Sequence, residues 1–517
     1  MAAEMVTQML GAVGAAGMNT QASPIDLDPS FATLAINCYA DEAGRPTARK
    51  SAQQYTTTHG TLLTSAVKRC YRHNKADGTS VRVLAGGGLI LTATATTLTD
   101  STAGPYADDY WQFASLNGKI FGVKESTAGV YFADTALTTP VALTTPSSVQ
   151  FKAIHAAYGR LWAITDTKLY WCDLLDGTAW SSGAFGSIDL QLVQTQMRDI
   201  AVAVTSFNGM IAVLCKNSIY VFDMDNTGTA SNPQPNPNAS NPIRLRDFIP
   251  FIGTVFRDSV VSTGDDVLFV SDDGVRSLSR SMAEQKGPAP LTDMSATNKD
   301  YVVNNLVRGN ATTSLTAAWD PERSWYMVFS ADTEEVWLFD FGHRMQGSNI
   351  PRMFIWRMGT AKKLYCGMWW SDDVMEFGGA SGVYRMNTYN ASDSYDMQIT
   401  TGWLSLGGAE RLDVFKRMML NITGGGGQTI TLRWYADFLS NSVRSVQFSL
   451  TSGQTVYEFG VAEYEDAEYS SGVSTAELYQ QIGGSGKVIQ LDLTIPVAGT
   501  AVTINNSALF YKQGRVR

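Results

Sequence analysis

Two glycine-rich runs could, by residue type and spacing, hold a phosphate. The run GGSGK at 483–487 ends in a lysine, and GGGG occupies 424–427. A P-loop needs a glycine, four further residues and then Gly-Lys followed by Ser or Thr. Here Gln481 and Val488 stand at the first and last of those positions. Both runs lie between alternating segments, so we predict that they are turns, with GGGG joining the two strands of a hairpin.

Pairs of neighbouring carboxylates could do acid–base chemistry. A glycoside hydrolase places two carboxylates at a fixed separation across a cleft, whereas neighbours in a turn point apart and accept backbone hydrogen bonds. One degenerate Asp-box turn, DGTAW at 176–180, is present, and G-x-S-x-G and H-E-x-x-H motifs are absent. We therefore expect no catalytic residue and no enzyme activity. The pairs are Asp108–Asp109, Asp265–Asp266, Asp272–Asp273 and Asp372–Asp373.

Metal-ligating residues show no complete pattern. Asp223, Asp225 and Gly228 begin like a calcium loop, but its twelfth position is Gln234 rather than Glu. A hydrated hairpin fits this segment better, with a weak oxygen-ligand site as the alternative. The five cysteines and four histidines are scattered without the spacing of a zinc site or a disulfide framework. We expect buried cysteines, no metal and no cofactor.

Composition narrows the class of protein. The chain has 517 residues and a net charge of −9, and 17% of its residues are charged, below the roughly 25% usual in soluble domains. A dedicated nucleic-acid binder would instead carry basic patches. No stretch approaches the eighteen apolar residues of a membrane helix, and residues 1–19 lack the basic start of a secretory signal. We expect synthesis in a cytoplasm and no membrane-spanning segment.

A hairpin pattern that repeats every 50 residues or so decides the architecture. Each copy is a turn, a short strand, a polar turn and a strand that reads apolar, aromatic, any residue, apolar, then Asp or Asn. Six such repeats predict an all-β fold, an irregular β-propeller of six blades, or seven if the stretch 81–97 forms its own blade. Helix patterns are confined to 2–16 and 60–70. The second strands are VYFAD (130–134), LYWCD (169–173), IYVFD (219–223), VWLFD (336–340) and VYRMN (383–387), with a degenerate VRSLS (275–279).

The C-terminal part of the chain has a different period. From about residue 397 the strands alternate strictly, as in KVIQLDLTI at 487–495. This alternation predicts a half-buried antiparallel sheet, most simply a β-sandwich. We therefore divide the chain into an N-terminal arm and platform segment (1–60), the propeller (61–396) and a C-terminal sandwich-like platform (397–517).

A loop rich in proline and asparagine, 224–242, interrupts the propeller repeats. Proline cannot donate to a strand ladder, so this segment is predicted to project from the fold. It is either a passive surface excursion or a tip that touches a partner or narrows a pore. The residues that we take as candidates for such a tip or gate are Asp225, Asn226, Pro233, Pro235, Pro237 and Asn238.

The two ends of the chain resemble a known family. The N-terminal features are Gly-Met-Asn at 17–19, Pro24, the stretch 28–31, Asn37, Gly44-Arg45 and Arg49-Lys50, and the C-terminal ones are FKRMMLNITGGG (415–426), GGSGKVIQLDLTI (483–495) and ALFYKQGRVR (508–517). In this order they resemble the tail nozzle proteins of short-tailed bacteriophages, also called packaged-DNA stabilisation or tail tubular B-type proteins. The family commonly has a more arginine-rich glycine loop where GGSGK stands, so we assign that loop no contact.

The resemblance implies a structural protein of the virion tail, made in the cytoplasm of a bacterial host. Six copies would form a ring below the portal and its adaptor, retain packaged double-stranded DNA and conduct it during ejection without reading its sequence. Tail fibre, spike or plug proteins would be further partners. An acidic chain suits a conduit, because a basic lumen would bind DNA phosphates. The residues that the resemblance points to for adaptor docking are Asp28, Phe31, Asn37, Arg45, Arg49 and Lys50.

A carbohydrate-binding propeller, or a glycan-active enzyme, is the alternative function. Twelve Trp and twenty-one Tyr side chains could stack on sugars, although most lie in the repeat strands, where core packing accounts for them. A ring-shaped homo-oligomer would favour the nozzle, and glycan turnover would favour the alternative.

Overall fold

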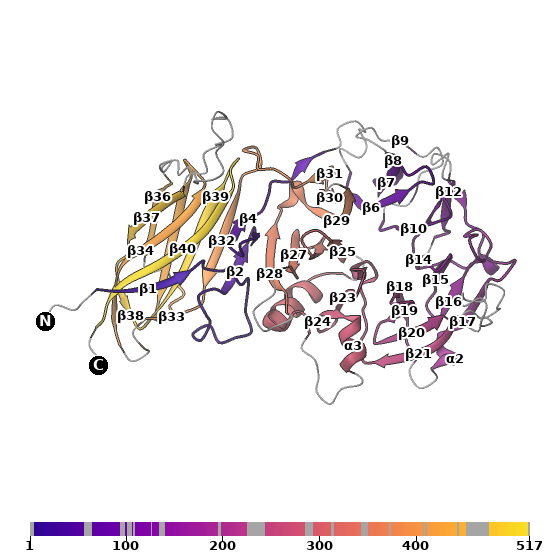
Figure 1. Cartoon of the computed structure of the whole chain (residues 1–517), viewed down its shortest axis with the longest axis horizontal. Coiled ribbons are helices and arrows are strands. Elements are labelled where there is room, and N and C mark those ends of the chain that lie inside the picture. The colour runs from indigo at the N-terminus through magenta and orange to yellow at the C-terminus, as the bar shows by residue number, and fades with distance from the viewer. Residues whose placement is uncertain are drawn as a thin grey trace, which may run out of the picture.

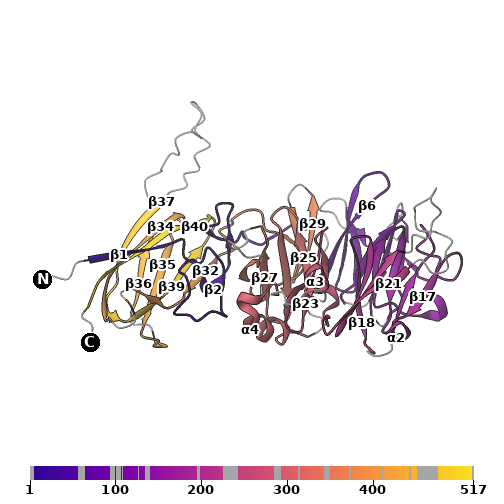
Figure 2. The same cartoon turned by 60° about the horizontal axis from the view of Figure 1, so that its bottom comes forward.

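The molecule is elongated, with a β-sandwich at one end and a ring of small sheets at the other (Figures 1 and 2). The computed structural model describes residues 5–55, 65–93, 99–100, 106, 109–125, 127–133, 140–194, 198–224, 243–284, 293–311, 315–342, 350–371, 374–406, 408, 411–441, 444–450 and 475–514. Both chain ends lie at the sandwich (Figure 1).

The ring is a β-propeller whose first strands contact one another in the closed order β6, β10, β14, β18, β22, β25, β29 and back to β6. In the described part of the chain, five of its sheets have four strands and β22–β24 has three, while the blade β25–β28 is part of a larger sheet. The first four blades are β6–β9 (Val67–Asn74, Ser80–Gly86, Leu89–Ala93, Thr99–Asp100), β10–β13 (Gln112–Leu116, Lys119–Val123, Val130–Ala133, Val141–Ala142), β14–β17 (Ala153–Ala157, Arg160–Ile164, Lys168–Trp171, Gly186–Asp189) and β18–β21 (Ala201–Phe207, Met210–Cys215, Ser218–Met224, Ile243–Pro250). Then follow β22–β24 (Val261–Ser262, Val267–Ser271, Gly274–Ser277), β25–β28 (Leu315–Asp320, Trp325–Ser330, Glu335–Asp340, Arg352–Arg357) and β29–β31 (Leu364–Ser371, Val374–Gly379, Gly382–Arg385) with β5 (Gln53–Gln54).

The repeat pattern forms these blades for local reasons. The turns before β11, β15 and β19 place Asn117, Tyr158 and Asn208 at φ of 45–55°, each followed by a glycine that also has positive φ. Two consecutive positive φ values give the tight turn whose twist matches paired strands. The strands that follow, such as β15, are buried along their whole length because blades cover both of their faces. The all-β propeller with a C-terminal sandwich is thus confirmed.

The ring is closed by the N-terminal segment. Strand β5 pairs with β31, with Gln54 opposite Tyr384 and Gln53 opposite Arg385, and supplies the outer strand of the last blade. The stretch 81–97 contributes β7 and β8 to a blade of its own. The degenerate repeat at 275–279 forms β24 and the start of a helix, α3 (Leu278–Glu284), instead of a complete hairpin strand.

The sandwich consists of two sheets whose alternating strands face a shared core. One sheet runs β3 (Cys38–Ala40), β4 (Pro46–Ala48), β40 (Val502–Lys512), β34 (Asp413–Gly424), β37 (Thr475–Gln481), with β1 (Met5–Gly11) on β40 and β38 (Ser485–Gly486) on β34. The other contains β2 (Ala32–Ile36), β32 (Tyr395–Thr401), β39 (Val488–Val497), β35 (Thr429–Ala436) and β36 (Arg444–Ser449), with β33 (Leu404–Ser405) on β39. The prediction of a GGGG hairpin is wrong, because 424–427 joins β34 to β35, which belong to different sheets. The helical pattern at 2–16 is also wrong, since Met5–Gly11 is a strand paired with β40.

The second sandwich sheet does not stop at the domain boundary. Strand β2 pairs in parallel with β28 of the propeller and antiparallel with β32 of the sandwich. One ten-stranded sheet therefore runs from β25 through β28 and β2 into β32, β39, β35 and β36 (Figure 1). Propeller and sandwich are joined through this N-terminal strand, by one residue pair with β28 (Ile36 opposite Ile355) and by a longer ladder with β32.

Helices are short. They are α2 (Leu190–Val193), α3, α4 (Lys299–Val302), the 3-10 turns η1 (Pro146–Ser148), η2 (Arg257–Ser259), η3 (Ala296–Asn298) and η5 (Thr360–Lys362), and a π-turn, η4 (Val303–Val307). Among the described residues, none of them is long and apolar enough to cross a membrane.

Candidate functional site

The junction between propeller and sandwich gathers most of the residues that the sequence singled out. Asn37 follows β2 in the left-handed region, at φ 57°, and is buried. Its amide oxygen accepts the backbone N–H of Arg357 (2.8 Å) and Nε of Arg49 (3.1 Å), and its amide nitrogen donates to the carbonyl of Asp396 (2.8 Å). One side chain thus bonds the propeller strand β28, the arm and the sandwich strand β32.

Arg49 completes this buried junction. Its guanidinium lies 3.8 Å from the centre of the Tyr395 ring and 3.8 Å from a carboxylate oxygen of Asp393, and it donates to the carbonyl of Lys50 (3.1 Å). The exposed fraction of Arg49 is 1% and that of Asn37 is 5%. Both side chains serve the junction from buried positions. Their predicted role in docking stays a prediction.

The other four docking candidates keep some exposure. Asp28 is exposed and accepts the backbone N–H of Ser30 (2.8 Å), and Phe31 is half-buried. The Arg45 side chain, 44% exposed, forms an ion pair with Asp41 (2.9 Å) and donates to Asn505 of β40 (2.9 Å). Whether these residues meet a partner stays a prediction; the sixth residue, Lys50, lines a cavity.

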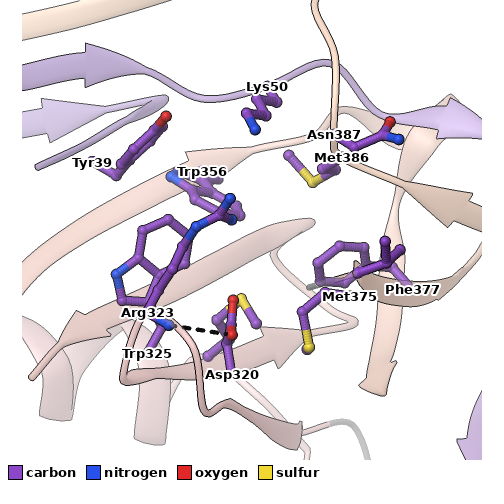
Figure 3. Close-up of a pocket in the computed structure, with 12 residues that line it drawn as sticks. Tyr39, Lys50, Asp320, Arg323, Trp325, Trp356, Met375, Phe377, Met386 and Asn387 are labelled. Carbon is purple, nitrogen blue, oxygen red and sulfur yellow. Dashed lines mark hydrogen bonds between the residues drawn. The ribbon is translucent and has the colours of Figure 1, made fainter. Parts of the chain in front are cut away.

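That cavity, of about 60 Å³, lies where the arm, the β25–β26 turn and the β30 blade strand meet (Figure 3). Lys50 and Arg323 point into it from opposite sides (Figure 3). Among the described residues neither side chain has an ion pair, and Arg323 lies over the Trp325 ring, 4.9 Å from its centre. The remaining lining residues are Tyr39, Asp320, Trp325, Met327, Trp356, Val374, Met375, Phe377, Met386 and Asn387.

Burial and the charges around this cavity shift the pKa values of two of its lining side chains. Burial lowers the pKa of the Lys50 ammonium, and the charge of Arg323 lowers it further, against the opposing charge of Glu322. Burial also raises the pKa of the Tyr39 phenol, which the Arg323 charge partly offsets. The carboxylate of Asp320 accepts hydrogen bonds within its own turn, from the backbone N–H groups of Glu322 (3.1 Å) and Arg323 (3.4 Å).

A larger, open groove of about 450 Å³ crosses the same junction on the face of the ten-stranded sheet. Its two arginines are both paired, Arg357 with Glu335 (3.0 Å) and Arg433 with Asp492 (3.6 Å). Its described lining contains no aromatic side chain. The groove therefore offers polar contacts but no platform on which a sugar ring could stack.

The axis of the propeller is occupied by a side chain that the sequence did not mark. Arg257 of η2 donates to the carbonyls of Tyr110 (2.6 Å) and Lys152 (2.8 Å), which precede β10 and β14. Its neighbour Asp258 lies 3.6 Å from Arg69 of β6. The η2 turn itself packs against β18, β23 and β25. Since the contacts of Arg257 and Asp258 reach the blades that begin with β6, β10 and β14, the pair spans the axis at the end of the propeller where η2 lies.

Where the structure describes them, the motifs that we considered for catalysis form local hydrogen bonds within turns. In the Asp-box-like turn, Asp176 accepts from Thr178 (2.6 Å), and the buried Trp180 donates to the carbonyl of Gly177 (2.7 Å). All five cysteines are free and buried. Within the described ranges, no three His, Cys, Asp or Glu side chains gather as metal ligands would.

The carboxylate pairs behave as turn-formers where they are described. Asp266 accepts from Ser277 and from the backbone of Ser279 (3.0 Å), and Asp273 is paired with Arg276. Asp109 forms an ion pair with Lys124 (3.1 Å). Asp108 and the pair Asp372–Asp373 lie outside the described residues, as do all six tip candidates of the 224–242 loop.

Sequence reasoning found Lys50 but missed Arg323, Arg257 and Asp393. Arg323 sits in an ordinary-looking turn, DPER, 273 residues after Lys50 in the chain. No local pattern could have joined the two, because only the closure of the ring against the arm brings them together.

Comparisons with known proteins bear on the fold alone. No protein-family model matches this sequence, and neither does any curated protein. Among solved structures, the chain aligns with the computationally designed Ika8 protein (11% identity, 64% of this chain and 99% of that chain, TM-score 0.34). It also aligns with a streptogramin B lyase (10% identity, 66% and 98%, TM-score 0.38) and the WD40 β-propeller domain of Doa1 (7% identity, 65% and 95%, TM-score 0.38). At these scores the likeness says nothing about function, and the propeller assignment stands on the strand pairing of this chain.

Proposed function

We propose that this protein is a structural subunit of a bacteriophage tail, a nozzle component that assembles with copies of itself into a ring, retains packaged DNA and conducts it during ejection. The observation that carries the proposal is the ten-stranded sheet that links the propeller to the sandwich through β2, which pairs with β28 at Ile36 and Ile355. A subunit that holds back a compressed genome has to transmit load without bending between its parts.

The junction is built for that rigidity. Domains joined only by a linker and a polar interface usually move relative to one another. Here strand pairing crosses the boundary. The buried Asn37 bonds to both sides of it, and the buried Arg49 supports Asn37 through a hydrogen bond. Hinge motion would have to break buried hydrogen bonds, each of which stabilises the junction by about 1 kcal/mol net.

The contacts across the propeller axis bear on the path that the proposal gives to DNA. Because Arg257 and Asp258 span the centre of the propeller, a duplex could not thread through it. DNA would instead run along the axis of the ring that several copies make. That ring, its six-fold symmetry and its adaptor, fibre and plug partners rest on the resemblance of the chain ends, as does the location in the virion tail.

Imaging tests the proposal directly. The purified full chain, and particles from a host that expresses it, would be examined by electron microscopy, with antibody labelling of the particles. We expect rings of copies with a central opening, and label on the tail. A panel of glycans should show neither turnover nor binding. A protein that stays monomeric at high concentration, labels no tail and binds or cleaves a glycan would overturn the proposal in favour of the carbohydrate-binding alternative.

A further inference from the structure

We propose that the cavity between Lys50 and Arg323 is a binding site for one compact oxyanion, with the charge and size of inorganic phosphate or of a single carboxylate group. The site is separate from the proposed tail function, and neither depends on the other.

Two cations that form no ion pair among the described residues carry the inference. Lys50 comes from the arm and Arg323 from the β25–β26 turn, and both aim at the same space (Figure 3). Among the described residues, neither has an ion pair to neutralise it. Like charges that face each other across a half-buried space repel, and burial removes part of the water that would screen them. The lowered pKa of Lys50 reports the same conflict, which an anion between the two groups would relieve.

The acidic groups nearby do not satisfy these cations. Asp320 forms the floor of the cavity, but its carboxylate accepts two backbone N–H groups of its own turn. Glu322 is exposed and is not part of the lining, although its charge opposes the lowering of the Lys50 pKa. Counting Lys50, Arg323 and Asp320, the lining keeps a net charge of +1.

Size and walls define the ligand. A cavity of about 60 Å³ falls far below the 300–1,000 Å³ of ordinary small-molecule sites. A nucleotide or a sugar does not fit, whereas one phosphate or one carboxylate does. The aromatic walls of Tyr39, Trp325 and Trp356 limit water, which strengthens charge-assisted hydrogen bonds to Lys50 and Arg323.

An oxyanion could reach the cavity from two sources. One is a free ion from solution, and the other is a carboxylate side chain of another protein molecule. Phosphate and acetate are the probes that separate them. Each would be titrated into the full chain at constant ionic strength, against chloride, by calorimetry and by thermal melting. Tighter binding of phosphate indicates a free tetrahedral ion, and tighter binding of acetate indicates a docked carboxylate.

Matched variants assign the binding to this cavity. We expect Lys50→Gln and Arg323→Gln each to weaken binding about tenfold or more, because each removes a charge-assisted bond. Arg323→Lys should keep much of the affinity. Lys216→Gln, at an exposed position away from the cavity, should leave it unchanged. Circular dichroism would verify that each variant is folded.

The proposal fails if neither probe binds the full chain, or if both bind the folded Lys50→Gln and Arg323→Gln variants as well as the parent. The second result would indicate an unspecific salt effect. Neither result would touch the ring assembly, which is measured by imaging.

Discussion

At the residue scale, Asn37 holds the junction through hydrogen bonds that no other side chain of its size can copy. It is buried in a left-handed conformation that asparagine tolerates better than most residues. We predict that Asn37→Ala lowers the free energy of unfolding by about 2–4 kcal/mol, since it strands the N–H of Arg357 and strains the backbone. Urea unfolding measures this loss. Asn117→Ala, at an exposed turn of similar φ, is the control; an equal loss there would contradict the role given to Asn37.

A second residue, His155, links stability to pH. Its Nε2 lies 3.0 Å from the Ser206 hydroxyl of the next blade, and burial lowers its pKa to about 4. The unfolded chain protonates this imidazole near pH 6.5, so between pH 6.5 and about 4 the unfolded state binds more protons. Stability should therefore fall as the pH drops through that window and level off below it. The loss should stay under about 3 kcal/mol because the ring keeps some exposure. Urea midpoints against pH test this, and His155→Gln should flatten the curve; an unchanged curve would refute the link.

At the element scale, the blades that close the ring are joined by a buried charge cluster. Glu376 of β30 accepts two bonds from Arg82 of the neighbouring β7 (2.7 and 2.9 Å) and a further pair from Arg385 of β31. Trp370 covers the Arg82 guanidinium at 3.7 Å. The closing interface thus depends on one fully buried carboxylate that serves two cations.

We predict that Glu376→Gln destabilises the protein by about 3–5 kcal/mol, because it removes the carboxylate charge that faces the buried Arg82 and the partly buried Arg385. Glu335→Gln removes a more exposed pair with Arg357 and should cost less than about 1 kcal/mol. Denaturant unfolding compares the two, and hydrogen exchange should show opening concentrated in β6, β7 and β30. Equal losses would mean that the cluster is not what closes the ring.

At the scale of the whole molecule, the N-terminal segment is a strand of both parts and not an appendage. Strand β1 lies on the outside of the first sandwich sheet, whereas β2 lies in the middle of the ten-stranded sheet. We predict that removing residues 1–11 leaves a soluble, cooperatively melting protein. Removing 1–55 should give an aggregating chain, because it exposes the edges of β28 and β32 and deletes the closing strand β5. A monodisperse 56–517 chain with a sharp melt would refute this arrangement.

The sequence alone determined the local architecture. Paired turn residues such as Asn117-Gly118 and Asn208-Gly209 predicted the hairpins, and the alternation around Leu491 predicted the sandwich strands, because turn chemistry and side-chain period act within a few residues. The wrong predictions arose because the same local signals do not specify long-range pairing. The GGGG segment has the chemistry of a turn, but nothing in it states which sheet the next strand joins.

Only the tertiary structure decided where the parts meet. Asn37 contacts the backbone of residue 357, 320 positions away, and Lys50 faces Arg323 across a cavity. Arg257 reaches the carbonyl of Tyr110, 147 positions away. Such pairings are fixed when the ring closes and the arm enters the sheet between β28 and β32. The free energy that stabilises these pairings comes from burial and hydrogen bonds between distant segments, so no local sequence pattern predicts them. The period of each strand, in contrast, depends only on the residues of that strand.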